Sequence, residues 1–219
     1  MFPRESPEYD VETVNLLHFS LLKLATSGPI PNNDNAAPRF QVRIMTDLAA
    51  LLDMFPPPDF LRAYEVLPAA QMPAPYQKLL VHPHHMTVTI EEHHGSPVDV
   101  RVLDDRLEGD VYVRKILLVL QSTGKIVQFG LVRIRLDFVS PEVRAEIVSR
   151  TTPLGRILIQ HNVLRTITPI SFLRVLPGPA MMAWFDLQTM TPTYGRVAVI
   201  TCDDQPAIEV LEIVSPEPV

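Results

Sequence analysis

Two long runs of apolar, largely β-branched residues, Val111–Gln121 and Ile126–Phe138, constrain the fold of this chain more than any other feature. A short polar segment, Ser122–Lys125, separates them, and Gly124 within it can adopt the positive φ that a tight turn needs. Strands joined by so short a turn pair as antiparallel neighbours. The sequence therefore predicts a long antiparallel hairpin.

Two helices and several further strands are expected around this hairpin. The string SPE at 140–142 supplies an N-cap, a proline at the first helical position and an early acid, which predicts a helix to about Arg150. The string TPLGR at 152–156 repeats this signal for a helix to about His161. Alternating or β-branched runs predict strands at Met86–Glu92, Val98–Leu103, Ile170–Leu176, Arg196–Thr201 and Ala207–Val214. Together these elements predict an α+β fold, a single antiparallel β-sheet with helices packed on one side.

The first part of the chain differs in composition, with many prolines and few runs of strand-forming residues. Gly28–Pro38 is typical of a loop, and apolar periodicity predicts helices over Val11–Ala25 and Asp47–Met54. We therefore expect residues 1–78 to form a helical, loop-rich extension that packs on the core, and residues 79–219 to form the main domain.

Charge and hydropathy limit the partners. A net charge of −6 argues against nucleic acid, because phosphate contacts need clustered lysines and arginines. No run reaches the ~18 apolar residues of a membrane span, and the N-terminus lacks the apolar core of a signal peptide. The single cysteine, Cys202, rules out an internal disulfide. These features predict a cytoplasmic protein with no membrane partner and no nucleic-acid partner.

Arg114 is the first candidate for a binding role. It has the same strand parity as Tyr112, Ile116 and Leu118, so it stands within an apolar stripe. A buried arginine needs an anion, because an unpaired charge in the interior is strongly destabilising. Two interpretations follow: an internal salt bridge, or bidentate capture of a carboxylate on a small-molecule substrate.

Glu212 is the natural counterpart of this cation, on the last predicted strand. Glu209 lies on the opposite parity of the same strand, and parity alone does not separate the two, because both stripes are apolar. A glutamate here could pair with Arg114 or Arg196. Gly155, in the first turn of the second helix, would let another backbone or a ligand approach closely.

Histidines at 82, 84, 85, 93 and 94 are concentrated in one window. Alternation would place His82 and His84 on one side of an extended segment, a spacing that a metal could use. However, no cysteine is near, and the neighbouring glutamates fall on the far side of the predicted strand. We interpret the group as a solvated cluster flanking turns and expect no metal. The chain also lacks a glycine-rich phosphate loop, so no cofactor is expected.

Five short motifs follow one another in a fixed order: MT at 86–87, RKILL at 114–118, TPLGR at 152–156, GR at 195–196, and Glu212 shortly before Pro216. Their order and spacing resemble the chorismate lyase (chorismate–pyruvate lyase) superfamily over about residues 79–216. The chain looks like a divergent, longer member. The resemblance implies a chorismate lyase-like fold and an enclosed pocket that needs no cofactor.

The resemblance also implies an activity, the elimination of pyruvate from chorismate to leave 4-hydroxybenzoate. As catalytic residues, Arg114 would hold the ring carboxylate and Glu212 would bond the hydroxyl group. The substrate-binding residues that it implies are Met86, Leu154, Gly155 and Arg196.

One stretch departs from this pattern, the apolar, proline-rich segment Val175–Phe185. It could be a core-facing loop, a subunit contact in a homo-oligomer, or a lid over a larger ligand. Two alternatives to the lyase therefore stand beside it. One is a tailoring enzyme, performing elimination or cyclisation on a larger apolar intermediate, with a pocket extended by Met181, Met182 and Trp184. The other is a non-catalytic small-molecule-binding domain.

Overall fold

The predicted hairpin is present in the structure, a computed structural model that describes residues 48–56 and 59–218. Strands β3 (Val111–Leu120) and β4 (Ile126–Arg135) pair antiparallel, and Gly124 in the turn has a φ of 71°. A β-carbon is disfavoured at this dihedral angle, so glycine suits the turn. The local turn signal was sufficient to predict this element.

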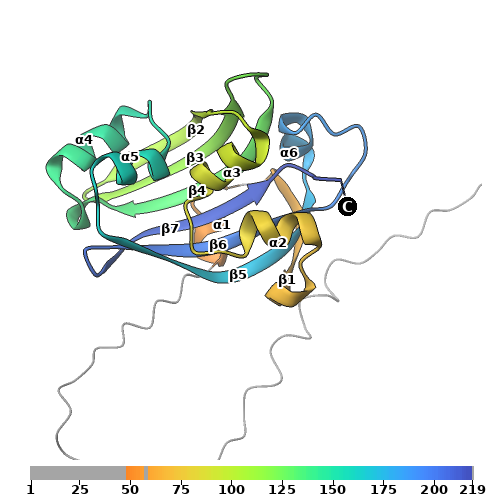
Figure 1. The fold of residues 1–219 in the computed structure, drawn as a ribbon, viewed down its shortest axis with the longest axis horizontal. Helices are drawn as coiled ribbons and strands as arrows, with labels where there is room; N and C mark the ends of the chain where they lie inside the picture. Colours follow the sequence, from red (N-terminus) through yellow and green to blue (C-terminus); the bar gives the residue numbers. More distant parts are fainter. Residues whose placement is uncertain (1–47, 57–58, 219) are drawn as a thin grey trace, which may run out of the picture. The chain divides into compact units, whose positions relative to one another are not determined.

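The hairpin belongs to a seven-stranded, fully antiparallel sheet with the order β1-β5-β6-β7-β4-β3-β2 (Figure 1). Positive φ values of 46° and 61° at Asp203 and Asp204 form the tight turn between β6 and β7. The remaining strands are β1 (Leu61–Leu67), β2 (Val98–Glu108), β5 (Arg165–Pro177), β6 (Thr193–Cys202) and β7 (Gln205–Val214). The four strands predicted to begin at residues 98, 170, 196 and 207 are all found here.

Four helices cover one face of the sheet: α2 (Ala74–Leu80), α3 (Met86–His94), α4 (Pro141–Ser149) and α5 (Leu154–Gln160) (Figure 1). Val143 of α4 and Ile157 of α5 pack against Tyr112 of the sheet, and Ile90 of α3 packs against Ile116. Helix α4 begins as predicted, because the Ser140 hydroxyl accepts the Val143 N–H at 3.4 Å. The predicted α+β fold is confirmed, a single antiparallel sheet with its four longer helices packed on one side.

The opposite face of the sheet carries two short helices, α1 (Leu48–Leu52) and α6 (Pro179–Trp184). Leu51 and Met181 pack there against Leu117 and Phe129, whose side chains alternate with those facing α2–α5. Two short 3-10 helices, Ala69–Gln71 and Leu136–Phe138, complete the described elements.

The prediction of a strand at Met86–Glu92 is wrong, since these residues form helix α3. The alternating β-branched residues favoured a strand, but propensity is a weak determinant that tertiary packing overrides. Met86 and Ile90, one helical turn apart, are both buried against the sheet. Gly95 ends the helix in the left-handed conformation with a φ of 62°, a C-cap signal that the strand prediction ignores.

Of the three interpretations of Val175–Phe185, the structure favours a core-facing segment and not a lid. Residues up to Pro177 continue β5, and Pro179 begins α6 on the face opposite the predicted site residues. A β-carbon at Gly178 would lie 2.3 Å from the Asp59 carbonyl oxygen, so glycine permits the close approach to the start of β1. Met181 and Trp184 therefore belong to the core of that face and do not extend a ligand pocket.

The predicted helix over residues 11–25 and the loop over 28–38 lie outside the described residues, and the division at residue 78 stays a prediction. Within 48–78 the structure adds strand β1, which pairs with β5 at the sheet edge. Five of its seven residues are exposed, so it lacks the alternation that identifies a half-buried strand. Among the helices that the structure describes, none is long and apolar enough to cross a membrane.

Candidate functional site

A cavity lies between the helix-covered face of the sheet and the first turns of α3 and α5. Its floor consists of alternate residues of β3, β4 and β7: Arg114, Ile116, Leu118, Gln128, Gly130, Val132, Val210 and Glu212. Its other walls include His85, Met86, Thr87, Pro153, Leu154, Gly155 and Arg196. The structure thus brings together all six residues predicted for the site, while their roles stay predictions.

The cavity is small. Its volume, counted as the space that the centre of a water molecule can occupy, is about 50 Å³. One water needs roughly 10–15 Å³ by this measure, whereas pockets for drug-sized ligands have volumes of about 300–1,000 Å³. In this conformation the cavity has room for a few waters or a very small ligand.

Arg114 reaches the cavity from β3 and is almost completely buried, with 1% of its surface exposed. Its Nε and Nη1 atoms have no hydrogen-bond partner in the part of the chain that the structure describes. Burial lowers the pKa of Arg114, while Tyr112 and Asp105 act in the opposite direction. The Asp105 carboxylate is already bound to Arg150 at 2.9 Å. Arg114 is therefore a buried cation with two donor atoms that lack a partner among the described residues.

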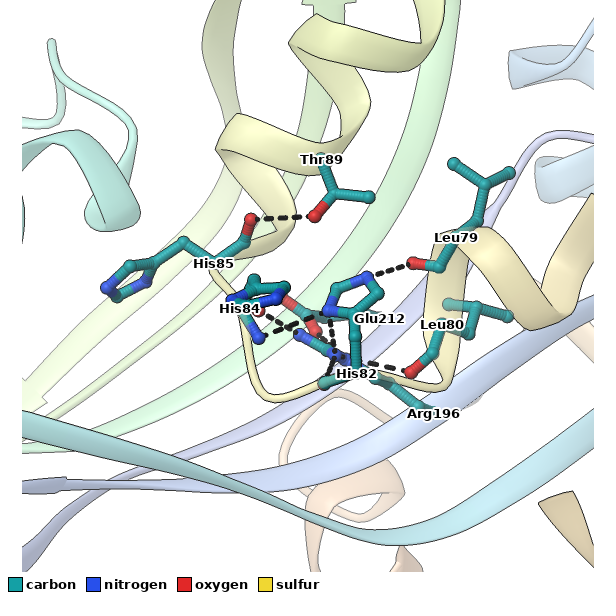
Figure 2. A network of polar contacts seen from close by, with 8 residues as sticks. All are labelled: Leu79, Leu80, His82, His84, His85, Thr89, Arg196 and Glu212. Carbon is teal, nitrogen blue, oxygen red and sulfur yellow. Dashed lines mark hydrogen bonds and ion pairs between the residues drawn. The ribbon is translucent and has the colours of Figure 1, made fainter.

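Arg196, at the other end of the cavity, has a full set of partners (Figure 2). Its Nε donates to Glu212 Oε2 at 2.7 Å, and its Nη1 and Nη2 donate to the carbonyl oxygens of His82 at 2.8 Å and His84 at 3.1 Å. A further bond of 3.3 Å joins Nη1 to the Leu80 carbonyl. Arg196 thus fixes the loop between α2 and α3 onto the sheet.

His82 contributes to the same network. Its Nε2 lies 2.7 Å from the Leu79 carbonyl, and its Nδ1 accepts the His84 N–H at 3.1 Å. Burial and the Arg196 cation lower the pKa of His82. A neutral ring with the proton on Nε2 satisfies both bonds. The five histidines predicted as one solvated cluster therefore have separate environments, and His82 is part of a partly buried network.

The structure separates the two glutamates that strand parity left equivalent. Glu212 faces the cavity and pairs with Arg196, whereas Glu209 pairs with Arg133 on the opposite face of the sheet. The expectation of a glutamate–arginine pair is met by Glu212 and Arg196. This pair uses Oε2 of Glu212.

Gly155 allows α5 to pack closely on the start of α3. A β-carbon at this position would lie 2.8 Å from Thr87 Oγ1 and 3.2 Å from His85 Cβ. The next residue, Arg156, pairs with Glu91 of α3. Glu91 Oε1 also accepts the Val98 N–H at 2.9 Å. The TPLGR string therefore holds two walls of the cavity together.

His85 forms part of the wall between the cavity and an outer groove. The groove has a volume of about 840 Å³, runs between α3 and the start of β5, and shares His85 and Ile167 with the cavity. Arg165 Nε donates to His85 Nε2. Burial, Arg165, Arg196 and His84 lower the pKa of His85 to about 4, so the ring is neutral at pH 7.

Gln128 is a cavity residue that sequence reasoning missed. Its side chain is buried, and its Oε1 has no hydrogen-bond partner among the described residues. It faces Leu118 across the hairpin, which places it on the same face as Arg114. Extending the parity of Arg114 across the predicted hairpin would have identified it.

Known proteins resemble this chain in structure rather than in sequence. No protein-family model matches the chain, and no curated protein matches it. Solved structures that match include PhnF from Mycobacterium smegmatis, at 13% identity and a TM-score of 0.42, with 62% of this chain and 65% of that chain covered. The chain thus spans less than two thirds of that protein.

Two further structures are similar to much the same degree. The effector domain of the same PhnF matches at 14% identity and a TM-score of 0.42, with 60% of this chain and 88% of that chain covered. A possible transcriptional regulator, YydK from Bacillus subtilis, matches at 9% identity and a TM-score of 0.38, with 56% of this chain and 60% of that chain covered.

The prediction of a carbon–oxygen lyase is wrong in the light of these findings. Two of the structures that match are described as an effector domain and a possible transcriptional regulator. The tailoring-enzyme alternative loses its extended pocket, because Met181 and Trp184 pack in the core on the opposite face of the sheet. The expectation that this chain has no nucleic-acid partner is not supported by these findings.

Proposed function

We propose that this chain is a non-catalytic small-molecule-binding domain whose inner cavity takes a small organic carboxylate. The observation that carries the proposal is Arg114, a cation with 1% of its surface exposed and with donors at Nε and Nη1 that lack partners among the described residues. Buried charges are normally paired, because removing them from water without compensation is unfavourable. A bound anion would supply the missing partner.

A carboxylate is the anion that this site favours. The guanidinium group has two edges with parallel N–H donors, Nε with Nη2 and Nη1 with Nη2, and each edge contains one of the unpaired atoms and matches the two oxygens of a carboxylate. The surrounding side chains, among them Ile116, Val132 and Leu154, are apolar and would contact an organic body. The competing explanation for the unpaired Arg114 donors is that a few waters in the cavity accept their hydrogen bonds, without any specific ligand.

The far end of the cavity offers acceptors for a second polar group. Glu212 uses Oε2 for Arg196, and Gln128 Oε1 is unpaired among the described residues. Glu212 lies on β7, two strands from Arg114 on β3, a separation of about 10 Å across the sheet. A hydroxyl group on the ligand, opposite its carboxylate, would reach these acceptors. The ligand class proposed is therefore a small hydroxy-carboxylate.

Access from solvent fits the position of the outer groove. Because His85 and Ile167 line both the groove and the cavity, a shift of these two side chains would join the two spaces. Such a shift would also enlarge the cavity for a ligand bigger than a few waters. We infer that the ligand enters through this wall.

Calorimetric titration of the pure protein with acetate, benzoate and 4-hydroxybenzoate tests the proposal. The neutral 4-hydroxybenzamide is the matched control, because it keeps the ring and hydroxyl but lacks the charge. We expect saturable binding of at least one carboxylate, at least ~10-fold weaker binding of the amide, and loss of binding in Arg114→Met.

Arg101→Met is the control variant, since Arg101 is an exposed arginine of β2 on the other face of the sheet. It should bind as the wild type does. Equal carboxylate binding by Arg114→Met and wild type would show that the cavity is not the site. No binding of any carboxylate in the series would contradict the proposed ligand class.

A further inference from the structure

Three potential metal ligands meet at the far end of α3, away from the cavity. His93 and His94 occupy the last turn of this helix, and Glu217 lies in the segment after β7. One ring nitrogen from each histidine and one carboxylate oxygen all lie within 4.8 Å of one another. Residues more than 120 positions apart in the chain thus place two imidazoles and a carboxylate around one point.

The separation of the first pair matches metal coordination. His93 Nε2 and Glu217 Oε2 are 3.2 Å apart. Two ligands bonded to tetrahedral Zn²⁺ at about 2.0–2.1 Å are separated by roughly 3.3 Å. The imidazole of His94 lies beside this pair, with its ring centroid 4.7 Å from that of His93.

An ion pair between His93 and Glu217 would not account for His94. The Nε2 atom of His94 is buried and has no hydrogen-bond partner within the described part of the chain. A buried imidazole nitrogen without a partner is unfavourable, and a metal ion is one of the groups that can satisfy it.

The carboxylate ligand is held in place by a neighbouring residue. The Glu217 N–H donates to the Tyr76 hydroxyl at 2.8 Å, and that hydroxyl lies 3.4 Å from the Glu217 carbonyl oxygen. Tyr76 is itself 1% exposed and packs on Tyr194 at 4.3 Å between ring centroids. The backbone of Glu217 is therefore anchored to a rigid part of the core, as metal ligands usually are.

We propose that His93, His94 and Glu217 bind a divalent transition-metal ion, with Zn²⁺ as the first candidate. Two imidazoles and a carboxylate suit Zn²⁺ and its neighbours in the first transition series, and a water would complete the coordination. The ion would fasten the segment after β7 to the end of α3. This proposal departs from the sequence-based expectation that these histidines bind no metal, which is otherwise untested. It is independent of the proposed function, because the cavity contacts only the first turn of α3.

Titration of the metal-stripped full chain, free of any histidine tag, with ZnCl₂ at pH 7.5 tests the site. We expect one ion per chain, and at least ~10-fold weaker binding in both His94→Ala and Glu217→Gln. His84→Ala is the matched control, because His84 is an exposed histidine outside the site, and it should bind as the wild type does. Co²⁺ in place of Zn²⁺ should give visible absorption bands that both site variants lose.

Urea unfolding of each variant without metal separates loss of ligand from loss of fold. Glu217→Gln keeps the size of the side chain. If His94→Ala is unfolded, the Zn²⁺ affinity of Glu217→Gln alone shows whether the site binds the ion. Absence of saturable Zn²⁺ binding by the wild type would overturn the proposal. Unchanged affinity in Glu217→Gln, or equal weakening in His84→Ala, would overturn it as well.

Discussion

At the scale of single residues, the cavity is defined by the contrast between two buried arginines. Arg196 has a carboxylate and three carbonyl oxygens as partners, whereas Arg114 has two donor atoms without partners in the described chain. The sequence could predict that Arg114 is buried, because it stands in an apolar stripe. It could not predict how Arg196 is satisfied, since those carbonyls come from residues more than 110 positions away.

His85 makes the stability of the fold depend on pH. Its pKa is lowered from 6.5 to about 4, so the unfolded chain binds more protons than the folded chain between these values. The free energy of unfolding should therefore fall as the pH decreases from about 6.5 to about 4, by up to on the order of 3 kcal/mol from this residue. Urea unfolding of wild type and His85→Gln at pH 4.5 and pH 7.5 measures the effect.

The His85→Gln variant should lose much of that dependence, and His84→Gln, at the exposed neighbour, should retain it. An equal pH dependence in wild type and His85→Gln would mean that the buried imidazole is not the source. The physical cause is burial, followed by the Arg165 and Arg196 cations that oppose a second positive charge.

At the scale of elements, the close packing of α5 on α3 depends on the absence of a side chain at Gly155. In Gly155→Ala the added carbon would meet Thr87 Oγ1 at 2.8 Å and must push the helices apart. We expect the free energy of unfolding to fall by about 1–3 kcal/mol. Combining Gly155→Ala with Thr87→Ala should recover part of this loss, because the hydroxyl is then gone. A double-mutant cycle by urea unfolding measures the coupling, and strictly additive losses would contradict this contact.

The Glu91 carboxylate supports the packing of α5 on α3 from the other side. It accepts from Arg156 of α5 and from the Val98 N–H of β2 at 2.9 Å. Glu91→Ala should lower the free energy of unfolding by about 1–3 kcal/mol, because a partly buried amide loses its acceptor. Glu92→Ala is the control, since Glu92 is exposed on the same helix. Thermal and urea unfolding should detect no comparable loss in that control.

Elements with local signals could be predicted from the sequence, and elements fixed by packing could not. Gly124 and Ser140 identify the turn and the helix start by their own chemistry. Helix α3 was predicted as a strand because Thr87 and its β-branched neighbours have a high strand propensity. Its helical conformation buries Met86, Thr87 and Ile90, which a local pattern does not reveal. Strand β1 was missed because an exposed edge strand has no apolar alternation to recognise.

At the scale of the whole molecule, the two faces of the sheet differ in the residues that they bury. The face under α1 and α6 buries an apolar cluster, in which Phe129 stacks on Trp184 at 5.3 Å between centroids, and its Arg133 and Glu209 are paired with each other. The other face interrupts its core with Arg114, Gln128, Arg196 and Glu212. Such polar residues inside a core reduce stability unless each is paired, and these four line the proposed binding site.

The most direct test of a carboxylate receptor is the urea unfolding of wild type and Arg114→Met, with and without excess 4-hydroxybenzoate. Without ligand, the methionine variant should be more stable by about 1–4 kcal/mol, because an incompletely paired buried charge is replaced by apolar volume. Ligand at 100 times its dissociation constant should stabilise the wild type by about 2.7 kcal/mol and leave Arg114→Met unchanged. A methionine variant that is less stable than the wild type would identify Arg114 as a structural residue and contradict the assignment of the cavity.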